Sequence, residues 1–375
     1  MGDKKKVPKI RFPEFTDEWE QRKLRDVAIR ESTTVMSSDK NPSIEYEDVV
    51  SEEGRLNKDI QLKDMQKNGI AFNGSHVLYG KLRPYLHNWL NPNFRGVAVG
   101  DWWVLKPNKI DKNFLYRLIQ TQKFDDVANQ STGSKMPRAD WNLVSNTIFD
   151  IPNSVDEQCK IAKTFTNLDN LITLHQRKLD HLKLLKKSML QKMFPRNGAK
   201  QPEVRFPGFA DDWEQRKVGE LIQSIPYKSF LKEPEKDGIF EIIQQGNEPI
   251  IGFANGNPCY EYKDTVIFGD HTLSVYKPIR PFFIATDGVR ILQGRQHIDG
   301  LYLYSLLERY RPQSEGYKRY YNILSDKECQ HTKNSDEQKQ IGEYFRNLDN
   351  LITLHQREVE HLKLLKKGML QKMFV

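Results

Sequence analysis

The chain has 375 residues, a formal net charge of +8 and a mean hydropathy of −0.70. This length allows two or more domains, and no apolar run is long enough to span a membrane or to form the core of an N-terminal secretory signal. We therefore expect a cytoplasmic protein, and the basic charge favours a polyanionic partner such as nucleic acid.

Two segments of the sequence occur twice. Residues 205–217 repeat residues 11–23 in the pattern RFPxFxDxWEQRK, and residues 348–374 repeat residues 168–194 at all but four positions. The intervening stretch has 144 residues in the first copy (24–167) and 130 in the second (218–347), and the two stretches share only a skeleton of positions, such as Asp101 and Asp287. Such a repeat predicts two half-molecules with one architecture, each a variable globular domain followed by a nearly constant helix.

In chain order, the repeat predicts a globular domain at 1–152, a spacer helix at 153–195, a second globular domain at 196–332 and a second spacer helix at 333–375. Short β-branched and aromatic runs predict strands within the globular domains, at 44–50, 97–105, 264–269 and 282–292. Segments 111–127 and 299–310 each begin with an aspartate suited to an N-cap and predict helices. The expected fold class of each globular domain is α+β.

The predicted spacer helices carry a heptad pattern of apolar residues, from 156 to 194 and again from 336 to 374. A single helix cannot bury its own row of apolar residues. We therefore expect the two helices to pack against each other as an antiparallel coiled coil between the globular domains, related by a pseudo-twofold axis. The residues expected in this seam are Leu168, Ile172, Leu179, Leu182, Leu348, Ile352, Val359 and Leu362.

Histidines and polar residues interrupt that seam. His175 and His181 are six residues apart on one helix, so they do not share a face as two metal ligands would. We therefore interpret these histidines as polar or packing residues of the seam between the helices, and we expect no metal site.

Basic loops in both globular domains combine cations with hydroxyl groups or aromatic rings, a pattern suited to phosphates and base edges. They are STGSKMPR at 131–138 and SEGYKRYY at 314–321, and GKLRPYL at 80–86 is a further candidate, although Arg83-Pro84 could instead be a turn that closes a strand pair. The candidate DNA-binding residues are Ser131, Thr132, Ser134, Lys135, Arg138, Lys81, Arg83, Tyr85, Tyr317, Lys318, Arg319 and Tyr321.

Signals of intrinsic catalysis are weak. A DNA methyltransferase needs a glycine-rich cofactor loop and a [DNS]PP[YFW] motif, but no such loop occurs and residues 91–94 read NPNF. The nuclease-like triplet at 261–263 has no counterpart in the first copy. We expect no catalytic residue, and two alternatives stay open: a protein-binding coiled-coil scaffold, or an intrinsic site-specific DNA methyltransferase or nuclease.

The sequence resembles the type I restriction–modification specificity (S) subunits over essentially its whole length. The resemblance rests on the twice-used RFPxFxxxW opening, on the DEQxxI entry to each helix (156–161 and 336–341) and on the LDxLIxLHQR–LKxLKKxMLQxMF spacer. GKLRPYL and STGSKMPRADW are similar to the first recognition domain of these proteins, and VIFGDH with FFIATDGVRIL to the second. One departure is the polar exit of the second domain, KECQHTKNSDEQ at 327–338, where the first domain has IFDIPNSVDEQ at 148–158.

The resemblance implies a non-catalytic DNA sequence-specificity subunit that reads a bipartite, asymmetric double-stranded site through two target-recognition domains. It also implies two adenine-methylating subunits that carry S-adenosylmethionine, and in some systems two restriction (motor-nuclease) subunits that use ATP and Mg²⁺. No cofactor and no membrane are expected for this chain itself.

Overall fold

A computed structural model describes residues 7–60, 66–130, 136–196, 198–296 and 298–374. Residue contacts divide the chain into two compact units, unit 1 (Met1–Leu174 with Glu358–Val375) and unit 2 (His175–Arg357). Two long helices, α5 (Val155–Lys192) and α9 (Ser335–Met373), each have one end in each unit. Within the described ranges, no helix is long and apolar enough to cross a bilayer.

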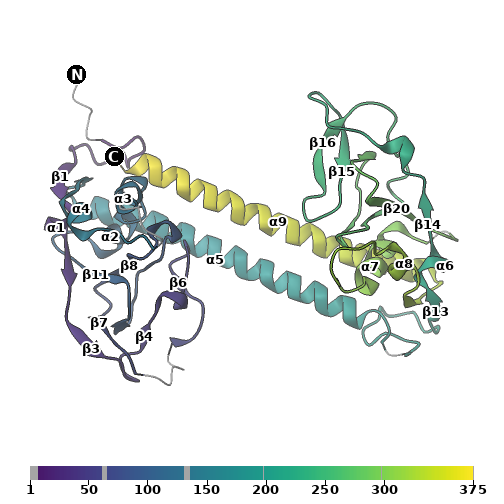
Figure 1. Ribbon diagram of the computed structural model, residues 1–375, viewed down its shortest axis with the longest axis horizontal. Coiled ribbons are helices and arrows are strands. Elements are labelled where there is room, and N and C mark those ends of the chain that lie inside the picture. The colour runs from purple at the N-terminus through teal and green to yellow at the C-terminus, as the bar shows by residue number, and fades with distance from the viewer. Residues whose placement is uncertain (1–6, 61–65, 131–135, 197, 297, 375) are drawn as a thin grey trace. The chain divides into compact units, whose positions relative to one another are not determined.

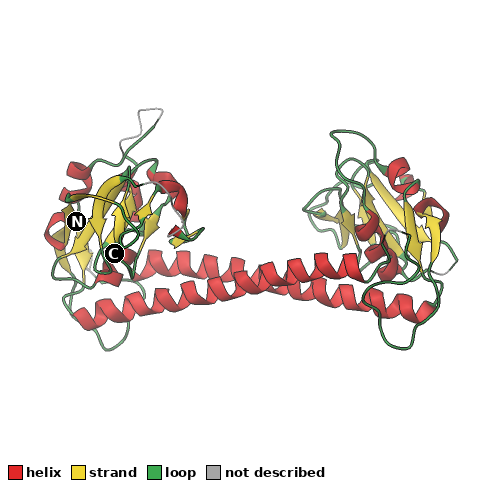
Figure 2. Ribbon diagram, turned by 90° about the horizontal axis from the view of Figure 1, so that it is seen from below, coloured by secondary structure: helices red, strands yellow, loops and turns green. Residues whose placement is uncertain are grey.

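Unit 1 is built on two four-stranded sheets among its described residues, with strand orders β2-β11-β8-β9 and β3-β7-β10-β4, and with short helices beside them (Figure 2). Strands β1 and β12 form a separate antiparallel pair, and β5 pairs with β6. The elements of this unit are β1 (Glu20–Lys23), α1 (Leu24–Val27), β2 (Ala28–Glu31), β3 (Thr34–Met36), β4 (Ser43–Ile44), η1 (Tyr46–Asp48), β5 (Val49–Val50), β6 (Arg55–Leu56), β7 (Asn68–Phe72), β8 (Val77–Gly80), η3 (Pro84–Leu86), β9 (Trp89–Leu90), β10 (Gly96–Ala98), β11 (Trp102–Pro107), α2 (Lys112–Leu118), α3 (Gln122–Ala128), α4 (Trp141–Asn146) and β12 (Ile148–Ile151).

Unit 2 repeats this plan with fewer strands among its described residues. Its four-stranded sheet has the order β14-β20-β17-β18, which matches β2-β11-β8-β9, and its second sheet has three strands, β16-β15-β19. The elements of this unit are β13 (Glu214–Lys217), α6 (Val218–Leu221), β14 (Ile222–Ile225), η4 (Lys228–Phe230), β15 (Phe240–Ile243), β16 (Ile250–Ala254), β17 (Thr265–Gly269), β18 (Val275–Tyr276), β19 (Phe282–Ile284), β20 (Val289–Gly294), α7 (Gly300–Tyr310), α8 (Tyr321–Ser325) and β21 (Glu328–His331). The α+β class and the long helices are therefore confirmed.

The long helices run antiparallel within each unit (Figure 1). In unit 1, Lys366 of α9 pairs with Asp169 of α5 at 2.7 Å, and in unit 2, Lys186 of α5 pairs with Asp349 of α9, also at 2.7 Å. Of the residues expected in the seam, five are buried and Ile172, Ile352 and Leu362 are half-buried. The same contacts thus recur at repeat-equivalent positions.

Each long helix ends in the core of one unit. Phe374, just beyond α9, packs edge-on against Trp19 in unit 1, and Phe194, just beyond α5, packs edge-on against Trp213 in unit 2. Both tryptophans are 2% exposed. The identical ends of the two helices are explained by these equivalent aromatic sockets.

An arginine–glutamate pair joins the two repeated motifs in each unit. Arg11 of the first RFP motif donates two hydrogen bonds to Glu157 of the first DEQ motif, at 2.6 and 2.8 Å. Arg205 makes the same fork to Glu337, at 2.7 and 3.0 Å. Both glutamates are 1% exposed, so these buried pairs fix the N-terminal segment of each unit to the start of its long helix.

Several strands and one helix that the sequence predicts as continuous are divided into shorter elements in the structure. The strand predicted at 97–105 is wrong, because Gly100 adopts φ = 90° and divides β10 from β11. The strand predicted at 44–50 contains η1, and that at 282–292 is divided into β19 and β20. The helix predicted at 111–127 is two helices, of which α2 is capped by the Asp111 side chain as expected.

The polar exit of the second domain forms the same strand as the apolar exit of the first. β21 pairs with β13 in the register that β12 takes with β1, with His331 opposite Glu214 as Ile151 is opposite Glu20. Cys329, His331 and Thr332 are buried there in spite of their polarity. The two copies therefore have the same backbone arrangement here although their side chains differ.

Candidate nucleic-acid interface

Two segments predicted separately to contact DNA lie side by side in unit 1. Backbone hydrogen bonds run from Arg83 N to Pro137 O (2.7 Å) and from Ala139 N to Lys81 O (2.8 Å), and Leu82 and Arg138 form an antiparallel bridge. Loop 81–88 also joins β8 to β9, which confirms the alternative interpretation of Arg83-Pro84 as part of a turn that closes a strand pair, while the contact with DNA stays a prediction.

Asp101 holds the cations of this edge. Nε and Nη2 of Arg138 each lie 3.1 Å from the Asp101 carboxylate, and Nζ of Lys81 lies 3.6 Å from it. The hydrogen bonds that the Arg138 guanidinium donates to the Asp101 carboxylate raise the pKa of the guanidinium, which stays charged. The Arg138 side chain is still 52% exposed, so the carboxylate orients the cation without burying it.

The turn that carries Arg83 is conformationally constrained. Arg83 has φ = 47° and precedes η3, and Tyr85 projects from that helix with 52% exposure. We refer to Lys81, Arg83, Tyr85 and Arg138 as the cationic edge of unit 1. Ser131, Thr132, Ser134 and Lys135 lie outside the described residues.

The cationic edge of unit 2, residues 317–319, is held by two aspartates. Nη2 of Arg319 lies 3.2 Å from Asp287, and Nη1 lies 3.9 Å from the fully buried Asp270. Lys318 forms an ion pair with Glu315, which raises the pKa of the lysine and lowers that of the glutamate. The arrangement again places exposed cations next to oriented carboxylates.

Tyrosines shape this second edge in different ways. Tyr320 is buried, and its hydroxyl donates to Gly316 O (2.6 Å) and accepts from Glu315 N (2.7 Å), which closes the loop. Tyr321 is half-buried, with Arg290 5.2 Å from its ring centre. Tyr317 is 89% exposed, so it is the ring of this loop best placed to meet a ligand.

Sequence reasoning did not assign a site role to His271 or to the anchoring aspartates. The His271 ring stacks on Tyr317, with ring centres 4.9 Å apart and planes 7° apart. The sequence skeleton matched Asp101 with Asp287, but the strand register aligns Asp101 with Gly288, one residue later. Both copies nevertheless have an aspartate at nearly the same position of the sequence skeleton, and this pattern could have indicated a carboxylate that orients the basic loop.

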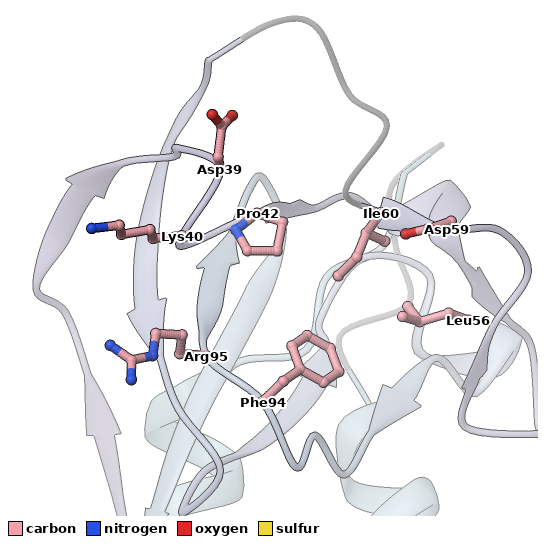
Figure 3. A pocket seen from close by; sticks show the side chains of 8 residues that line it. All are labelled: Asp39, Lys40, Pro42, Leu56, Asp59, Ile60, Phe94 and Arg95. Carbon is pink, nitrogen blue, oxygen red and sulfur yellow. The ribbon is translucent and has the colours of Figure 1, made fainter.

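Unit 1 also has a hollow of about 470 Å³ that sequence reasoning did not identify. Figure 3 shows Lys40 and Arg95 on one side of it and Leu56, Ile60 and Phe94 across from them. The rest of the lining is Asp39, Pro42 and Asp59. Two cations and two carboxylates leave this lining without net charge at neutral pH, in contrast to the cationic edge.

Comparison with known proteins finds similarity to one described family and to curated proteins. Residues 16–184 match the family described as "Type I restriction modification DNA specificity domain". Two curated proteins of Methanocaldococcus jannaschii are similar. The putative type I restriction enzyme MjaX specificity subunit is 23% identical over 96% of this chain and 93% of its own, and the type I restriction enzyme MjaVIII specificity subunit is 25% identical over 69% of each.

Solved structures share the fold of the chain. A crystal structure of the type I restriction-modification system S subunit from M. genitalium aligns with a TM-score of 0.69 and 15% identity, over 98% of this chain and 99% of that one. A chain from a study of complex assembly and conformational transition of the type I R-M system aligns with a TM-score of 0.52 and 17% identity, over 95% and 97%.

Proposed function

We propose that the chain is a type I restriction–modification DNA specificity subunit, and that its two units read the two halves of a bipartite, asymmetric DNA site. The proposal is supported by the similarity of residues 16–184 to the specificity-domain family and of nearly the whole chain to a specificity subunit. In this proposal the chain recognises DNA and catalyses no reaction itself. In this proposal, residues 1–152 and 196–332 are the target-recognition domains, and residues 153–195 and 333–375 are the spacer helices that connect them.

The observation that carries the proposal is the recurrence of an exposed, carboxylate-oriented arginine at the same place in both units. Arg138 stands beside Asp101, and Arg319 stands beside Asp287, each just before a short helix, α4 or α8. Arginine reads guanine edges and phosphates through a planar fork of donors. Since the other side chains of the two edges differ, the two half-sites should differ in sequence.

The long helices offer apolar surface for partner subunits. Leu171 and Leu174 of α5 in unit 1 are 43% and 61% exposed, and the equivalent Leu351 and Leu354 of α9 in unit 2 are 44% and 50% exposed. Exposed leucines at successive helical turns indicate a protein contact. We propose that two methyltransferase subunits dock there and carry S-adenosylmethionine, and that restriction subunits, where present, supply the ATP and Mg²⁺ chemistry.

The proposal is tested by mapping methylated adenines in a host that expresses this chain with its cognate methyltransferase subunit. The wild-type chain should give one split motif with a fixed gap. Arg138→Ala should weaken or relax one half of that motif, and Arg319→Ala the other half, by about 10-fold or more per altered contact. Arg25→Ala removes an exposed cation of unit 1 away from the edge and should leave both halves unchanged.

The outcomes distinguish recognition of one half-site by each arginine from a general electrostatic attraction to DNA. Equal loss at both half-sites in either variant would show that these arginines support the fold or the overall electrostatic attraction. DNA binding of the reconstituted complex should also weaken steeply with salt, because phosphate contacts release counterions. Salt-independent behaviour would favour a scaffold that binds only protein.

A further inference from the structure

Two repeat-equivalent histidines meet in unit 2. His175 of α5 and His355 of α9 place their Nδ1 atoms 3.1 Å apart, and their ring centres are 5.3 Å apart. His355 is 6% exposed and His175 is half-buried. A neutral imidazole offers the lone pair of one ring nitrogen to a metal ion.

This separation is close to what a tetrahedral metal ion requires. Zinc binds histidine nitrogens at about 2.0–2.1 Å, so two ligands at the tetrahedral angle stand roughly 3.3 Å apart. The observed Nδ1 pair would need to open by only a few tenths of an ångström. Imidazole pairs favour Zn²⁺ and related transition metals over Mg²⁺ or Ca²⁺, which prefer oxygen ligands.

A third donor follows on the same helix. Glu358 comes three residues after His355 in α9, one turn along the same helix face, and its carboxylate lies within 4.8 Å of the His355 ligand nitrogen. Position 358 is one of the four at which the repeated segments differ, because the first copy has Lys178 there. The carboxylate is therefore specific to the second copy, whereas a lysine there would repel a cation.

We propose that His175 and His355, assisted by Glu358, form a Zn²⁺ site that clamps α5 to α9. Two histidines and one carboxylate leave a fourth position for water, as in open zinc sites. Four residues beyond each histidine the seam is apolar, since Leu179 is 4% and Val359 is 5% exposed. The sequence interpretation excluded a metal because it compared histidines on one helix, whereas the structure pairs the same residue of the two copies.

The site is tested on the full chain without a histidine tag. Isothermal titration with Zn²⁺ should give one site per chain, and Co²⁺ should give the visible absorption of a tetrahedral nitrogen–oxygen site. Zn²⁺ at about 100 times its dissociation constant should raise the melting temperature by roughly 5–10 °C, because only the folded chain holds both ligands.

Variants assign the ligands. His175→Asn and His355→Asn keep a polar residue of smaller size and should each lower Zn²⁺ affinity at least 100-fold, and Glu358→Lys, which copies the first repeat, should lower it at least 10-fold. The double variant His181→Asn/His361→Asn removes exposed histidines of the same helices and should bind as the wild type does. Circular dichroism checks that each variant stays helical. Absence of binding at 100 µM Zn²⁺, or binding that survives His355→Asn in a folded chain, would overturn the proposal.

Discussion

Replacing Glu157 with alanine should destabilise unit 1 by about 3–5 kcal/mol. The Arg11 side chain is 10% exposed and the Glu157 side chain 2%, so the substitution leaves a largely buried guanidinium without its counter-charge. Trp19 Nε1, which donates to the same carboxylate at 3.2 Å, also loses its acceptor. A domain has about 5–15 kcal/mol of stability in total, so a loss of this size should shift unfolding measurably.

Two further variants separate the charge from the packing. Glu157→Gln keeps the size and one acceptor oxygen, and should cost about 1.5–3 kcal/mol, the contribution of hydrogen bonds to a charged group. Arg11→Met combined with Glu157→Met removes both charges together and should recover most of the loss, since a buried ion pair can be replaced by apolar side chains of similar volume at little cost.

The assay is urea unfolding of the full chain followed by tryptophan fluorescence and by hydrogen exchange. Five of the six tryptophans precede residue 175, so fluorescence reports mainly on unit 1, and exchange in individual peptides resolves the two units. Glu337→Ala, the repeat-equivalent change, should instead weaken protection in unit 2. A loss below about 1 kcal/mol for Glu157→Ala, or a double variant as unstable as the single one, would refute the role given to this pair.

Two other predictions concern unit 2. Burial lowers the pKa of His331 to about 4, below its ordinary value near 6.5, so the unfolded chain binds the proton first. Stability should therefore fall by up to about 3 kcal/mol as the pH drops from 6.5 to 4, and His331→Phe should flatten this part of the curve of urea midpoint against pH. Lys186→Met removes a cation that is 12% exposed and pairs with both Glu308 and Asp349, and should cost about 3 kcal/mol by leaving two carboxylates together. Lys366→Met, whose cation pairs with Asp169, is the matched control in unit 1, and an equal loss there in thermal unfolding would contradict this reasoning.

The features that sequence reasoning captured are those set by local chemistry. The capping aspartates 111 and 299 accept hydrogen bonds from the first turns of α2 and α7, because an N-cap needs only a short acceptor side chain before a helical run. The heptad pattern likewise predicted α5 and α9 to within two residues at either end. The break at Gly100 was missed because its positive φ has no signature beyond the glycine itself.

The site depends on contacts between residues that are distant in sequence. The bridge between Leu82 and Arg138 joins residues 56 positions apart, and no spacing rule relates them. The approach of His175 to His355 depends on the exact register of two helices 180 residues apart. A heptad pattern predicts that such helices pair, but it leaves the register open wherever several registers bury similar apolar side chains.

The constancy of the backbone at the cationic edges suggests how such a site can change its specificity. In unit 1 the residue after β8, Lys81, donates its N–H to Asp101 O and accepts from Ala139 N. In unit 2 the residue after β17, Asp270, donates to Gly288 O and accepts from Tyr320 N. One position therefore carries a cation in one copy and an anion in the other, while its hydrogen bonds are unchanged. Because these bonds involve only main-chain atoms, the edge accepts new side chains without loss of its geometry, and charge can be redistributed along it to suit a different half-site.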